Sequence, residues 1–564
     1  MRLPIFLACL LLPAVATAKS DRPAHGHPRP SPTILSIVGT SDLHGHLDAL
    51  PTFSGYLQNL RAIRNTDGAT LLLDAGDMFQ GTLESNLSEG EPVVEAYNAL
   101  GYTAVAIGNH EFDFGPVGPS PSPQKPGDDP RGALRARAAQ AKFPFLAANV
   151  VVAATGQPPA WKNITGTHLV KLGDLTVGIV GVVTPAAGKT SLPANVKDLR
   201  FLPLAPTIAA AAQNLRQQGA TVIIAVAHEG GGCQDFAAPD DLTSCAVDSE
   251  IFQMARALPP GAVDVIVAGH AHQAIAKVVA GIPIIESYAN GRAFGRVDLA
   301  IDPKRHTVQA HTVFAPRDIC AAREGDCQPG DYEGQPVLPD ESLRARLAPA
   351  YARAKDKGKE SLGIDVTAFL PHNRSRETAL GNWLVDRMRE TQPGADVAMM
   401  NGGGLRAGFP AGKLTFARLY EAFPFDNAFA SFPLPAGELR KRFARAFDRG
   451  SSQMSIAGLR IVGKCKDQRL ELAFLKPDGT PVANDTVLRV LTTDYLASGG
   501  DGFFGELTVP VEIGPPVRDA VAEMARQRGG TLDPADPALF DPQHPRIDLP
   551  RPVPVRCGGE NKSP

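Results

Sequence analysis

The amino-acid sequence predicts an α/β protein with two domains that are joined by a helix. Apolar runs such as residues 34–38 alternate with amphipathic segments up to about residue 314, which is typical of a layered α/β domain. Residues 339–360 are rich in helix formers and contain few large apolar residues, which predicts a linker helix. Helical patterns at residues 378–389 and 437–448, and an apolar run at residues 488–492, then predict a second α/β domain.

The first residues read as a secretory signal peptide. Met1 and Arg2 precede an apolar stretch over residues 3–15, and a small-residue cleavage site ends at Ala18. The apolar stretch is too short to span a bilayer. We therefore expect an exported protein, periplasmic or extracellular, with residues 1–18 removed and residues 19–33 forming a mobile Pro-rich segment.

The cysteines favour disulfide bonds. Removal of the signal removes Cys9 and leaves six cysteines, and an even number in an oxidising compartment favours pairing. Proximity in the sequence suggests three pairs, although six cysteines allow many other pairings. The suggested pairs are Cys233 with Cys245, Cys320 with Cys327, and Cys465 with Cys557.

The composition excludes several classes of protein. The chain has 564 residues, a net charge of −3 and 43% hydrophobic residues, which is ordinary for a globular protein of more than one domain. It contains no basic tract that would bind a nucleic acid polymer, and its balanced charge argues against an electrostatic membrane anchor. The sequence carries no signal for an oligomeric state.

Five polar clusters in the first half have the residue types of a metal site, and most follow an apolar run that reads as a strand. Side chains at such strand ends converge on one edge of a sheet. Carboxylates mixed with imidazoles suit Zn²⁺, Mn²⁺ or similar ions, and an Asp that bridges two ions is typical of a two-metal hydrolytic centre. We expect Asp77 to be this bridge. The clusters are Asp42-Leu43-His44, Gly76-Asp77, Gly108-Asn109-His110-Glu111, Ala227-His228-Glu229 and Gly269-His270-Ala271-His272.

Two polar insertions follow these clusters, at residues 115–131 and 230–245. Both are expected to lie near the mouth of the site, where long loops often serve as lids or as passive surface excursions.

Clusters in the second half suggest a ligand with a phosphate and an aromatic part. Arg374 precedes a predicted helix, and Arg406 ends the Gly-rich run that begins at Asn401, so both guanidinium groups are placed to meet a phosphate. Two further segments, residues 424–427 and 494–503, each offer an aromatic ring beside polar groups.

The order of these motifs resembles the calcineurin-like metallophosphoesterases, and more closely their 5′-nucleotidase branch. The resemblance implies a four-layered αββα metallophosphoesterase domain over residues 34–337 and a linker helix over residues 338–361. It also implies a C-terminal α/β 5′-nucleotidase domain over residues 362–550, followed by a tail over residues 551–564. Two divalent metal ions, Zn, Mn or similar, are the expected cofactors.

The resemblance also assigns roles to residues of the first domain. One metal would be held by Asp42, His44, Asp77 and His272. The other would be held by Asp77, Asn109, His228 and His270. His110 and Asp113 match the pair that the family places beside the reacting phosphate, and Asn109 would also stabilise charge there.

In the second domain, the resemblance implies a nucleotide clamp. Arg374 and Arg406 would hold phosphate oxygens, and Asn401 and Asn427 would make polar contacts. Phe425 and Tyr495 would stack on the base, and Asp501 would accept hydrogen bonds from the ribose hydroxyls. Tyr495 stands where the family commonly has Phe, which leaves the base preference open.

The predicted function is hydrolysis of nucleoside 5′-monophosphates by attack of a metal-bound hydroxide, with closure of the domains about the linker. The same centre could serve 2′,3′-cyclic nucleotides or nucleotide diphosphate sugars. A distant relative acts on thiosulfonate groups, but the clamp residues argue against that chemistry. An exported nucleotide-binding protein without activity would have lost metal ligands, whereas every ligand position here holds a competent residue. A pure metal carrier would leave the clamp unexplained.

Overall fold

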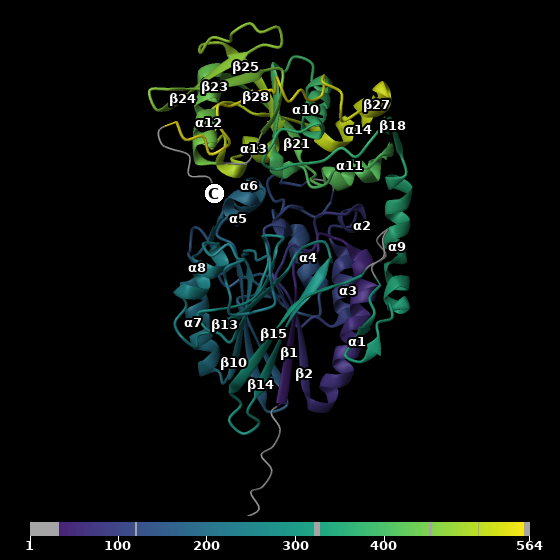
Figure 1. The fold of residues 1–564 in the computed structure, drawn as a ribbon, viewed down its shortest axis with the longest axis vertical. Coiled ribbons are helices and arrows are strands. Elements are labelled where there is room, and N and C mark those ends of the chain that lie inside the picture. The colour runs from purple at the N-terminus through teal and green to yellow at the C-terminus, as the bar shows by residue number, and fades with distance from the viewer. Residues whose placement is uncertain are drawn as a thin grey trace, which may run out of the picture.

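The computed structural model describes residues 33–118, 121–123, 125–320, 328–450, 454–505 and 507–557. The predicted signal peptide, nearly all of the Pro-rich segment, Cys327 and the last seven residues of the predicted tail lie outside these ranges. Figure 1 shows two lobes, with the N-terminal part of the chain in the lower lobe and the C-terminal part in the upper lobe. Among the described helices, none is long and apolar enough to cross a membrane.

The N-terminal lobe contains two large sheets that pack face to face. The first has the strand order β15-β14-β1-β2-β3-β4-β6, and the second has the order β12-β13-β11-β10-β8-β7. The strands of the first sheet are β15 (Val308–Asp318), β14 (Ala293–Ile301), β1 (Thr33–Thr40), β2 (Gly68–Asp74), β3 (Ala104–Ala106), β4 (Phe145–Leu146) and β6 (Ile164–Thr165). Those of the second are β12 (Ala274–Val279), β13 (Ile282–Ser287), β11 (Val265–Ala268), β10 (Val222–His228), β8 (Leu175–Val183) and β7 (Thr167–Leu172).

Alternation along the strands separates the layers of this lobe. Leu35 and Ile37 of β1 pack in the core between the two sheets, whereas Val38 packs on the outer face against α1 (Leu50–Asp67). Helices α3 (Glu91–Leu100) and α4 (Gly132–Gln140) cover the same outer face. On the other side, α7 (Leu204–Gln217) and α8 (Glu250–Ala257) cover the second sheet. The predicted four-layered αββα architecture is therefore confirmed.

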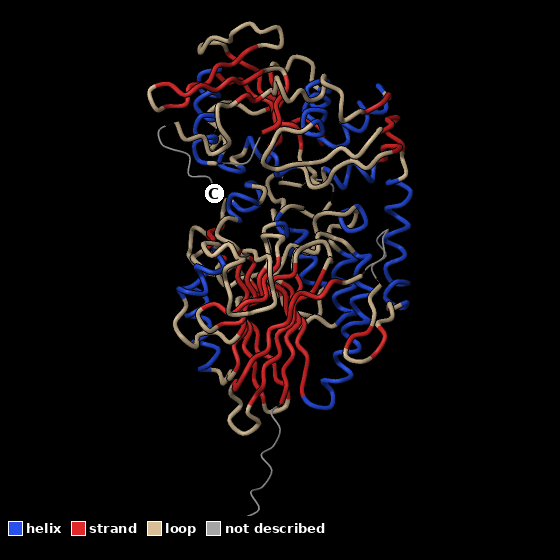
Figure 2. Tube along the Cα trace, in the orientation of Figure 1, coloured by secondary structure: helices blue, strands red, loops and turns tan. Residues whose placement is uncertain are grey.

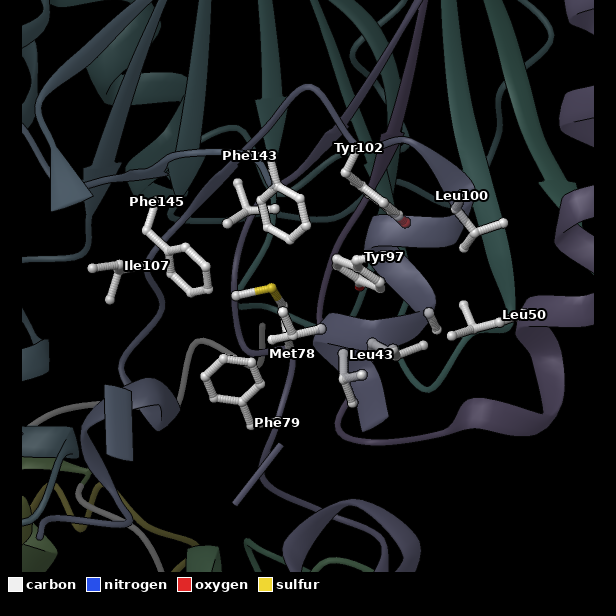
Figure 3. Close-up of a cluster of buried hydrophobic side chains, with 14 of the residues drawn as sticks. Leu43, Leu50, Met78, Phe79, Tyr97, Leu100, Tyr102, Ile107, Phe143 and Phe145 are labelled. Carbon is white, nitrogen blue, oxygen red and sulfur yellow. The ribbon is translucent and has the colours of Figure 1, made fainter. Parts of the chain in front are cut away.

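An aromatic cluster supports the loop that follows β2. Met78 and Phe79 point into the buried group shown in Figure 3, together with Phe145 and Tyr97. The rings of Tyr97 and Tyr102 stack with their centroids 3.9 Å apart. This packing fixes the backbone next to Asp77, because close-packed side chains leave little room for the loop to shift.

The C-terminal lobe is built on a five-stranded mixed sheet with helices on both faces. Met400 of strand β19 (Val397–Asn401) packs with α10 (Ala379–Thr391) and α14 (Val517–Arg528). Met399 packs on the opposite face with α12 (Ala436–Arg449). The sheet order is β22 (Met454–Ala457), β19, β25 (Val487–Thr493), β21 (Ala428–Pro435) and β26 (Glu512–Pro516). The helices and strand predicted for this half are confirmed.

The smaller elements complete the fold around these sheets. Two three-stranded sheets lie in the C-terminal lobe, with orders β20-β18-β27 and β24-β23-β28, and β5 pairs with β9 in the N-terminal lobe. The further strands are β5 (Val150–Val152), β9 (Leu199–Phe201), β16 (Asp331–Tyr332), β17 (Gln335–Pro336), β18 (Ser361–Val366), β20 (Gly412–Thr415), β23 (Arg460–Lys466), β24 (Arg469–Leu475), β27 (Gly530–Leu532) and β28 (Ile547–Asp548). The further helices are α2 (Leu83–Asn86), α5 (Ala187–Thr190), α6 (Pro193–Val196), α11 (Phe416–Ala422) and α13 (Asp494–Ala497), with short 3-10 turns at Leu47–Ala49, His110–Phe112, Gly402–Gly404 and Gly500–Gly502.

The predicted linker is the helix α9 (Glu341–Gly358), which runs up one side of the N-terminal lobe and reaches the C-terminal lobe at its upper end in Figure 1. The side chain of Asp340 caps it by accepting a hydrogen bond from the backbone N of Leu343, at 3.0 Å. Leu347 packs in the core of the N-terminal lobe, while Ala354 packs in the core of the C-terminal lobe. One helix is therefore anchored in both cores.

Two of the three predicted disulfides are confirmed. Cys233 pairs with Cys245, and Cys465 pairs with Cys557. The third predicted pair, Cys320 with Cys327, involves a residue outside the described ranges.

Candidate functional site

Five strands of the N-terminal lobe end at the boundary between the lobes and deliver the predicted metal ligands. In Figure 2 loops gather between the strands of the lower lobe and the upper lobe. Asp42 and His44 follow β1, Asp77 follows β2, Asn109 follows β3, His228 ends β10, and His270 and His272 follow β11. The loops brace one another, since the backbone N of Asp42 donates to the carbonyl of Gly76 at 2.9 Å.

The first group of ligand atoms comprises Asp42, His44 and His272, whose donor atoms lie within 4.8 Å of one another. Nε2 of His44 is 3.0 Å from Nε2 of His272, which in turn is 3.5 Å from Oδ1 of Asp42. Imidazole nitrogens that face one another at this distance repel or compete for one proton unless a cation lies between them. This arrangement fits a divalent metal ion.

The second group comprises Asp77, His228 and His270, also within 4.8 Å. Nε2 of His228 lies 3.1 Å from Oδ2 of Asp77, 3.0 Å from Oδ1 of Asn109 and 3.1 Å from Nδ1 of His270. The structure therefore brings together all seven predicted ligands. Their mixture of carboxylate, amide and imidazole donors suits Zn²⁺, Mn²⁺ or a similar ion.

Backbone carbonyls orient two of these imidazoles. Nδ1 of His44 lies 2.7 Å from the carbonyl oxygen of Gln80, and Nδ1 of His228 lies 2.8 Å from that of Ala75. Because a carbonyl accepts a hydrogen bond from a protonated Nδ1, the Nε2 atom of each ring is the one that offers a lone pair to an ion. This second layer of contacts is typical of histidines that bind metals.

The ligand loops hold an uncommon backbone conformation. Five of the seven candidate ligands have positive φ angles, which L-residues rarely adopt. Each such residue costs about 1–3 kcal/mol, and such strain persists at functional sites where the surrounding structure enforces it. The five are Asp42 (52°), His44 (49°), Asp77 (57°), His270 (79°) and His272 (57°).

The protonation of two ligand histidines suits metal binding, whereas His228 is an exception. Burial lowers the pKa of His270 to about 3 and that of His272 to about 2, so both rings are neutral at pH 7. Burial also opposes charge on Asp77, but the neighbouring His228 and His110 hold the pKa of that carboxyl well below its usual range. Neutral imidazoles and an ionised carboxylate are the states that bind a cation. Burial opposes the charged form of His228, but the neighbouring Asp77 outweighs this effect and raises the pKa of the ring to about 10, so an ion would have to displace its proton.

His110 lies beside the ligand groups without belonging to either. Nδ1 of His110 is 2.5 Å from Oδ2 of Asp113, and its backbone N donates to Oδ1 of Asp77 at 2.9 Å. Burial opposes its charged form, but Asp113 and Asp77 outweigh this effect and raise the pKa of His110. The ring is thus placed to hold a proton next to the candidate metal ligands.

Glu111 is a structural residue of the site that sequence reasoning did not assign. Its buried carboxylate accepts hydrogen bonds from the backbone N atoms of Asp77, Met78 and Gly108, at 2.8, 2.7 and 2.7 Å. A Cβ atom on Gly108 would lie 2.1 Å from Oδ1 of Asp77, so only glycine fits there. Glu111 therefore ties the loops after β2 and β3 together.

A cavity of about 250 Å³ lies between the lobes and joins the metal ligands to the predicted clamp. Its lining includes Pro121 from the first insertion, but no residue from the second insertion. Gly230 instead packs behind the turn after β11, where a Cβ atom would lie 2.3 Å from the carbonyl oxygen of Gly269. Both insertions were expected near the mouth of the site; the second contacts the turn that carries His270 and His272 but does not itself line the cavity. The clamp residues that line the cavity are Arg374, Asn401, Arg406, Phe425, Asn427, Tyr495 and Asp501.

Two arginines give the cavity a positive end that faces the metal ligands. Neither Arg374 nor Arg406 forms a salt bridge within the described ranges. Burial, and then the neighbouring Arg374, lowers the pKa of Arg406 to about 10. Both arginines also lower the pKa of His272, so their charge reaches across the boundary between the lobes. An anion between the guanidinium groups and the metal ligands would balance this charge.

The other end of the cavity is lined by the aromatic side chains of Phe425 and Tyr495. The ring of Phe425 lies 5.7 Å from that of His110 and 5.8 Å from the guanidinium carbon of Arg406. The hydroxyl of Tyr495 lies 2.7 Å from Oδ1 of Asp501 and 2.9 Å from the carbonyl oxygen of Lys189. Lys189 belongs to the N-terminal lobe, so Tyr495 contacts both lobes. This contact could not be found from the sequence, because it joins residues that are 306 positions apart in two different lobes.

Two amides hold the polar groups of this end. Nδ2 of Asn401 donates to Oδ2 of Asp501 at 2.7 Å, and Nδ2 of Asn427 donates to Oδ1 of Asp494 at 3.1 Å. The Asn401 bond positions the Asp501 carboxylate in the wall of the cavity. Because the Nδ2 atom of Asn427 already donates to Asp494, the Oδ1 atom is the group of this side chain that remains to face a ligand.

Comparison with known proteins agrees with this geometry. Residues 35–274 match the calcineurin-like phosphoesterase family, and residues 359–506 match the 5′-nucleotidase C-terminal domain family. The UshA protein of Salmonella pullorum is 25% identical over 573 residues, which cover 94% of this chain and 96% of that protein.

Two solved structures share the fold. The 5′-nucleotidase precursor of Thermus thermophilus has a TM-score of 0.69 and 22% identity, and the likeness covers 92% of this chain and 99% of that one. The sulfate thiohydrolase SoxB of the same organism, in complex with glycerol, has a TM-score of 0.67 and 15% identity, covering 95% and 99%. Both family matches lie in the lobes that carry the metal ligands and the clamp. The chain therefore belongs to the calcineurin-like metallophosphoesterases of the 5′-nucleotidase family and is a metal-dependent hydrolase.

Proposed function

We propose that this protein is an exported 5′-nucleotidase that uses two divalent metal ions to hydrolyse nucleoside 5′-monophosphates. The observation that carries the proposal is the shared cavity. Both groups of candidate metal ligands and the whole clamp line or border one space of about 250 Å³. A phosphate at the metal end would place the rest of a nucleotide against Phe425 and Tyr495.

The clamp separates this proposal from other chemistry on the same fold. A nucleotidase and a thiohydrolase both share the architecture, so the fold alone does not choose between them. Phe425 and Tyr495 supply two aromatic faces, which stack on any base. Arg374 and Arg406 supply the donors that a phosphate prefers. A small sulfur-linked substrate would leave the aromatic end without a partner.

In the proposed reaction the residues of this chain bind, orient and supply a proton. The two ions, when bound, lower the pKa of a water molecule and withdraw charge from the phosphate. Arg374 and Arg406 hold phosphate oxygens from the side opposite the metal ligands. His110, kept protonated by Asp113, stabilises the charge of the transferring group or protonates the leaving ribose oxygen. Asn109, which directly precedes His110 in the chain, helps to stabilise the same charge.

Disulfides support the proposed export. The pairs Cys233–Cys245 and Cys465–Cys557 require an oxidising compartment in most organisms. This agrees with the signal peptide that residues 1–18 predict and with a periplasmic or extracellular location.

The test incubates the purified mature chain with AMP, 2′,3′-cyclic AMP or UDP-glucose, each with and without a chelator, and identifies the products by ³¹P NMR: inorganic phosphate from AMP, a ring-opened nucleoside phosphate from the cyclic nucleotide, and UMP with glucose 1-phosphate from UDP-glucose. We expect phosphate release from AMP that stops with the chelator and returns with Zn²⁺ or Mn²⁺. Chelator-sensitive turnover of another substrate, with none of AMP, would move the assignment within the family. Binding of AMP without turnover of any substrate would contradict an enzymatic role.

A further inference from the structure

A second cavity of about 360 Å³ lies behind the clamp and is strongly basic. Four cationic side chains line it, with one carboxylate, that of Asp501. The cations are Lys189 from the N-terminal lobe and Arg442, Arg445 and Arg449 from α12. Neither the metal site nor the clamp uses the side chains of these four residues.

The three arginines form a row on one face of α12. They are spaced by three and four residues, so their side chains lie above one another on the helix. Like charges at this spacing destabilise a helix by about 0.2–0.5 kcal/mol per pair. Arg445 and Arg449 are exposed, and neither they nor Lys189 forms a salt bridge within the described part of the chain. A row of this kind is stabilised when an anion binds to it.

The first arginine of this row, Arg442, is held in place by a hydrogen bond. Its Nη1 atom donates to the carbonyl oxygen of Phe504, which lines the same cavity, while its Nε atom is buried and has no hydrogen-bond partner among the described residues. A buried donor without a partner costs free energy unless a ligand or water accepts from it. The hydrogen bond to Phe504 holds the guanidinium group of Arg442 at the wall of the cavity.

Asp501 is the wall between the two cavities, since it lines both. Tyr495 bonds to Asp501 on the clamp side, and the Lys189 carbonyl that Tyr495 also contacts belongs to a residue of the second cavity. In the proposed function Asp501 receives the ribose hydroxyls. A group attached to one of these hydroxyls would therefore lie beside Asp501, next to the basic cavity.

We propose that this cavity binds a second phosphate on the ribose of the nucleotide, and that nucleoside 3′,5′-bisphosphates are a substrate class of this enzyme. This inference rests on the proposed function. A 3′-phosphate beside Asp501 would be repelled if the carboxylate stood alone. The four cations on the far side of Asp501 make the net charge around the second cavity positive, and they supply hydrogen-bond donors that suit a phosphate.

The reaction would remove only the 5′-phosphate. Water attacks the 5′ phosphorus, the bond between that phosphorus and the ribose O5′ breaks, and O5′ takes up a proton. The products are inorganic phosphate and a nucleoside 3′-phosphate, whose 3′ ester is untouched. The 3′-phosphate serves as a handle for binding.

The test compares adenosine 3′,5′-bisphosphate with AMP as substrates of the metal-loaded full chain. Steady-state phosphate release gives kcat/KM, and ³¹P NMR identifies the phosphate that is lost. The variant is Arg445→Ala with Arg449→Ala, which removes two exposed cations of the cavity. The control is Arg469→Ala with Lys476→Ala, which removes the same charge from exposed positions of the same lobe outside the cavity.

We expect the Arg445/Arg449 variant to lower kcat/KM for the bisphosphate about tenfold through a higher KM, since exposed charge contacts contribute modestly. AMP turnover should stay the same, the control should match the wild type, and the NMR product should be adenosine 3′-phosphate. An equal loss on both substrates, or none on either, would overturn the inference while AMP turnover still supports the nucleotidase. Loss of the 3′-phosphate would overturn it as well. No turnover of AMP by the wild type would instead refute the proposed function.

Discussion

The two ends of the cavity between the lobes are built in different ways. At the metal end, Asp42, Asp77 and His228 are at most 1% exposed and stand at strand ends, held by strained backbone and by carbonyl contacts. At the clamp end, Phe425 and Tyr495 are half-buried and lie in short segments between larger elements. We infer that the buried, tightly held metal end suits catalysis and that the half-buried clamp end suits recognition of the substrate.

This difference predicts a hierarchy of effects. A change at the metal end alters groups that have no freedom to compensate, so it should abolish turnover. A change in the clamp removes one of several contacts with the nucleotide, so it should weaken binding by a smaller factor. The predictions below test this hierarchy from its largest expected effect to its smallest.

Asp77→Asn should have the largest effect. The substitution keeps the size of the side chain but removes the charge of the carboxylate that we expect to bridge the two metal ions. We expect kcat for AMP to fall roughly a thousandfold, because the metal supplies several kcal/mol of charge stabilisation. Phosphate release and metal content per chain measure this. Asp48→Asn, at an exposed position, is the control and should behave as the wild type.

Arg406→Ala should reduce kcat/KM for AMP by roughly ten- to a hundredfold, since hydrogen bonds to charged groups contribute about 1.5–3 kcal/mol. Metal content should not change, because Arg406 comes from the other lobe. Arg376→Ala, at an exposed neighbour of Arg374 that does not line the cavity, is the control. A loss of metal in Arg406→Ala would contradict the division between the two ends.

Asp113→Asn should shift the pH dependence of kcat. Asp113 helps to raise the pKa of His110, and a raised pKa keeps the imidazolium populated to higher pH. Without that carboxylate the pKa falls, so activity should be lost at lower pH, by roughly one unit. At pH 7 the loss should be about tenfold or less. An alkaline limb that does not move in the pH profile would argue against a proton on His110.

Tyr495→Phe should have the smallest effect. It keeps the ring but removes the contacts of the hydroxyl with Asp501 and with the carbonyl of Lys189. One hydrogen bond contributes about 0.5–1.5 kcal/mol net, so KM for AMP should rise by roughly two- to tenfold. Tyr495→Ala should raise it further. Equal effects of the two substitutions would show that the hydroxyl, and not the ring, provides the contribution of Tyr495.

The sequence predicted which side chains gather at the metal end, because each candidate ligand ends or follows a strand. Continuous apolar runs such as that of β1 locate buried strands, and parallel strands bring their ends to one edge. The sequence alone therefore predicts that residues as far apart in the chain as Asp42 and His272 lie close together in the fold. The αββα layers follow from the same runs, since strands apolar on both faces need cover on both sides.

Contacts that depend on loop paths could not be predicted. The Glu111 carboxylate reaches three backbone N atoms, and nothing in the residue type tells which ones. The bond between Asn401 and Asp501 joins residues that are 100 positions apart in two different turns. The insertion at residues 230–245 follows His228 in the sequence, but the turn after β11 lies between it and the cavity.

The central claim is that one lobe performs the chemistry and the other selects the nucleotide. The most direct test is the ratio of kcat/KM for AMP to that for ribose 5-phosphate, which lacks the base, in the wild type and in Phe425→Ala. Stacking contributes about 1–3 kcal/mol per base, so the ratio should fall roughly five- to a hundredfold in the variant, with turnover of ribose 5-phosphate unchanged. An unchanged ratio, or an equal loss on both substrates, would contradict the account.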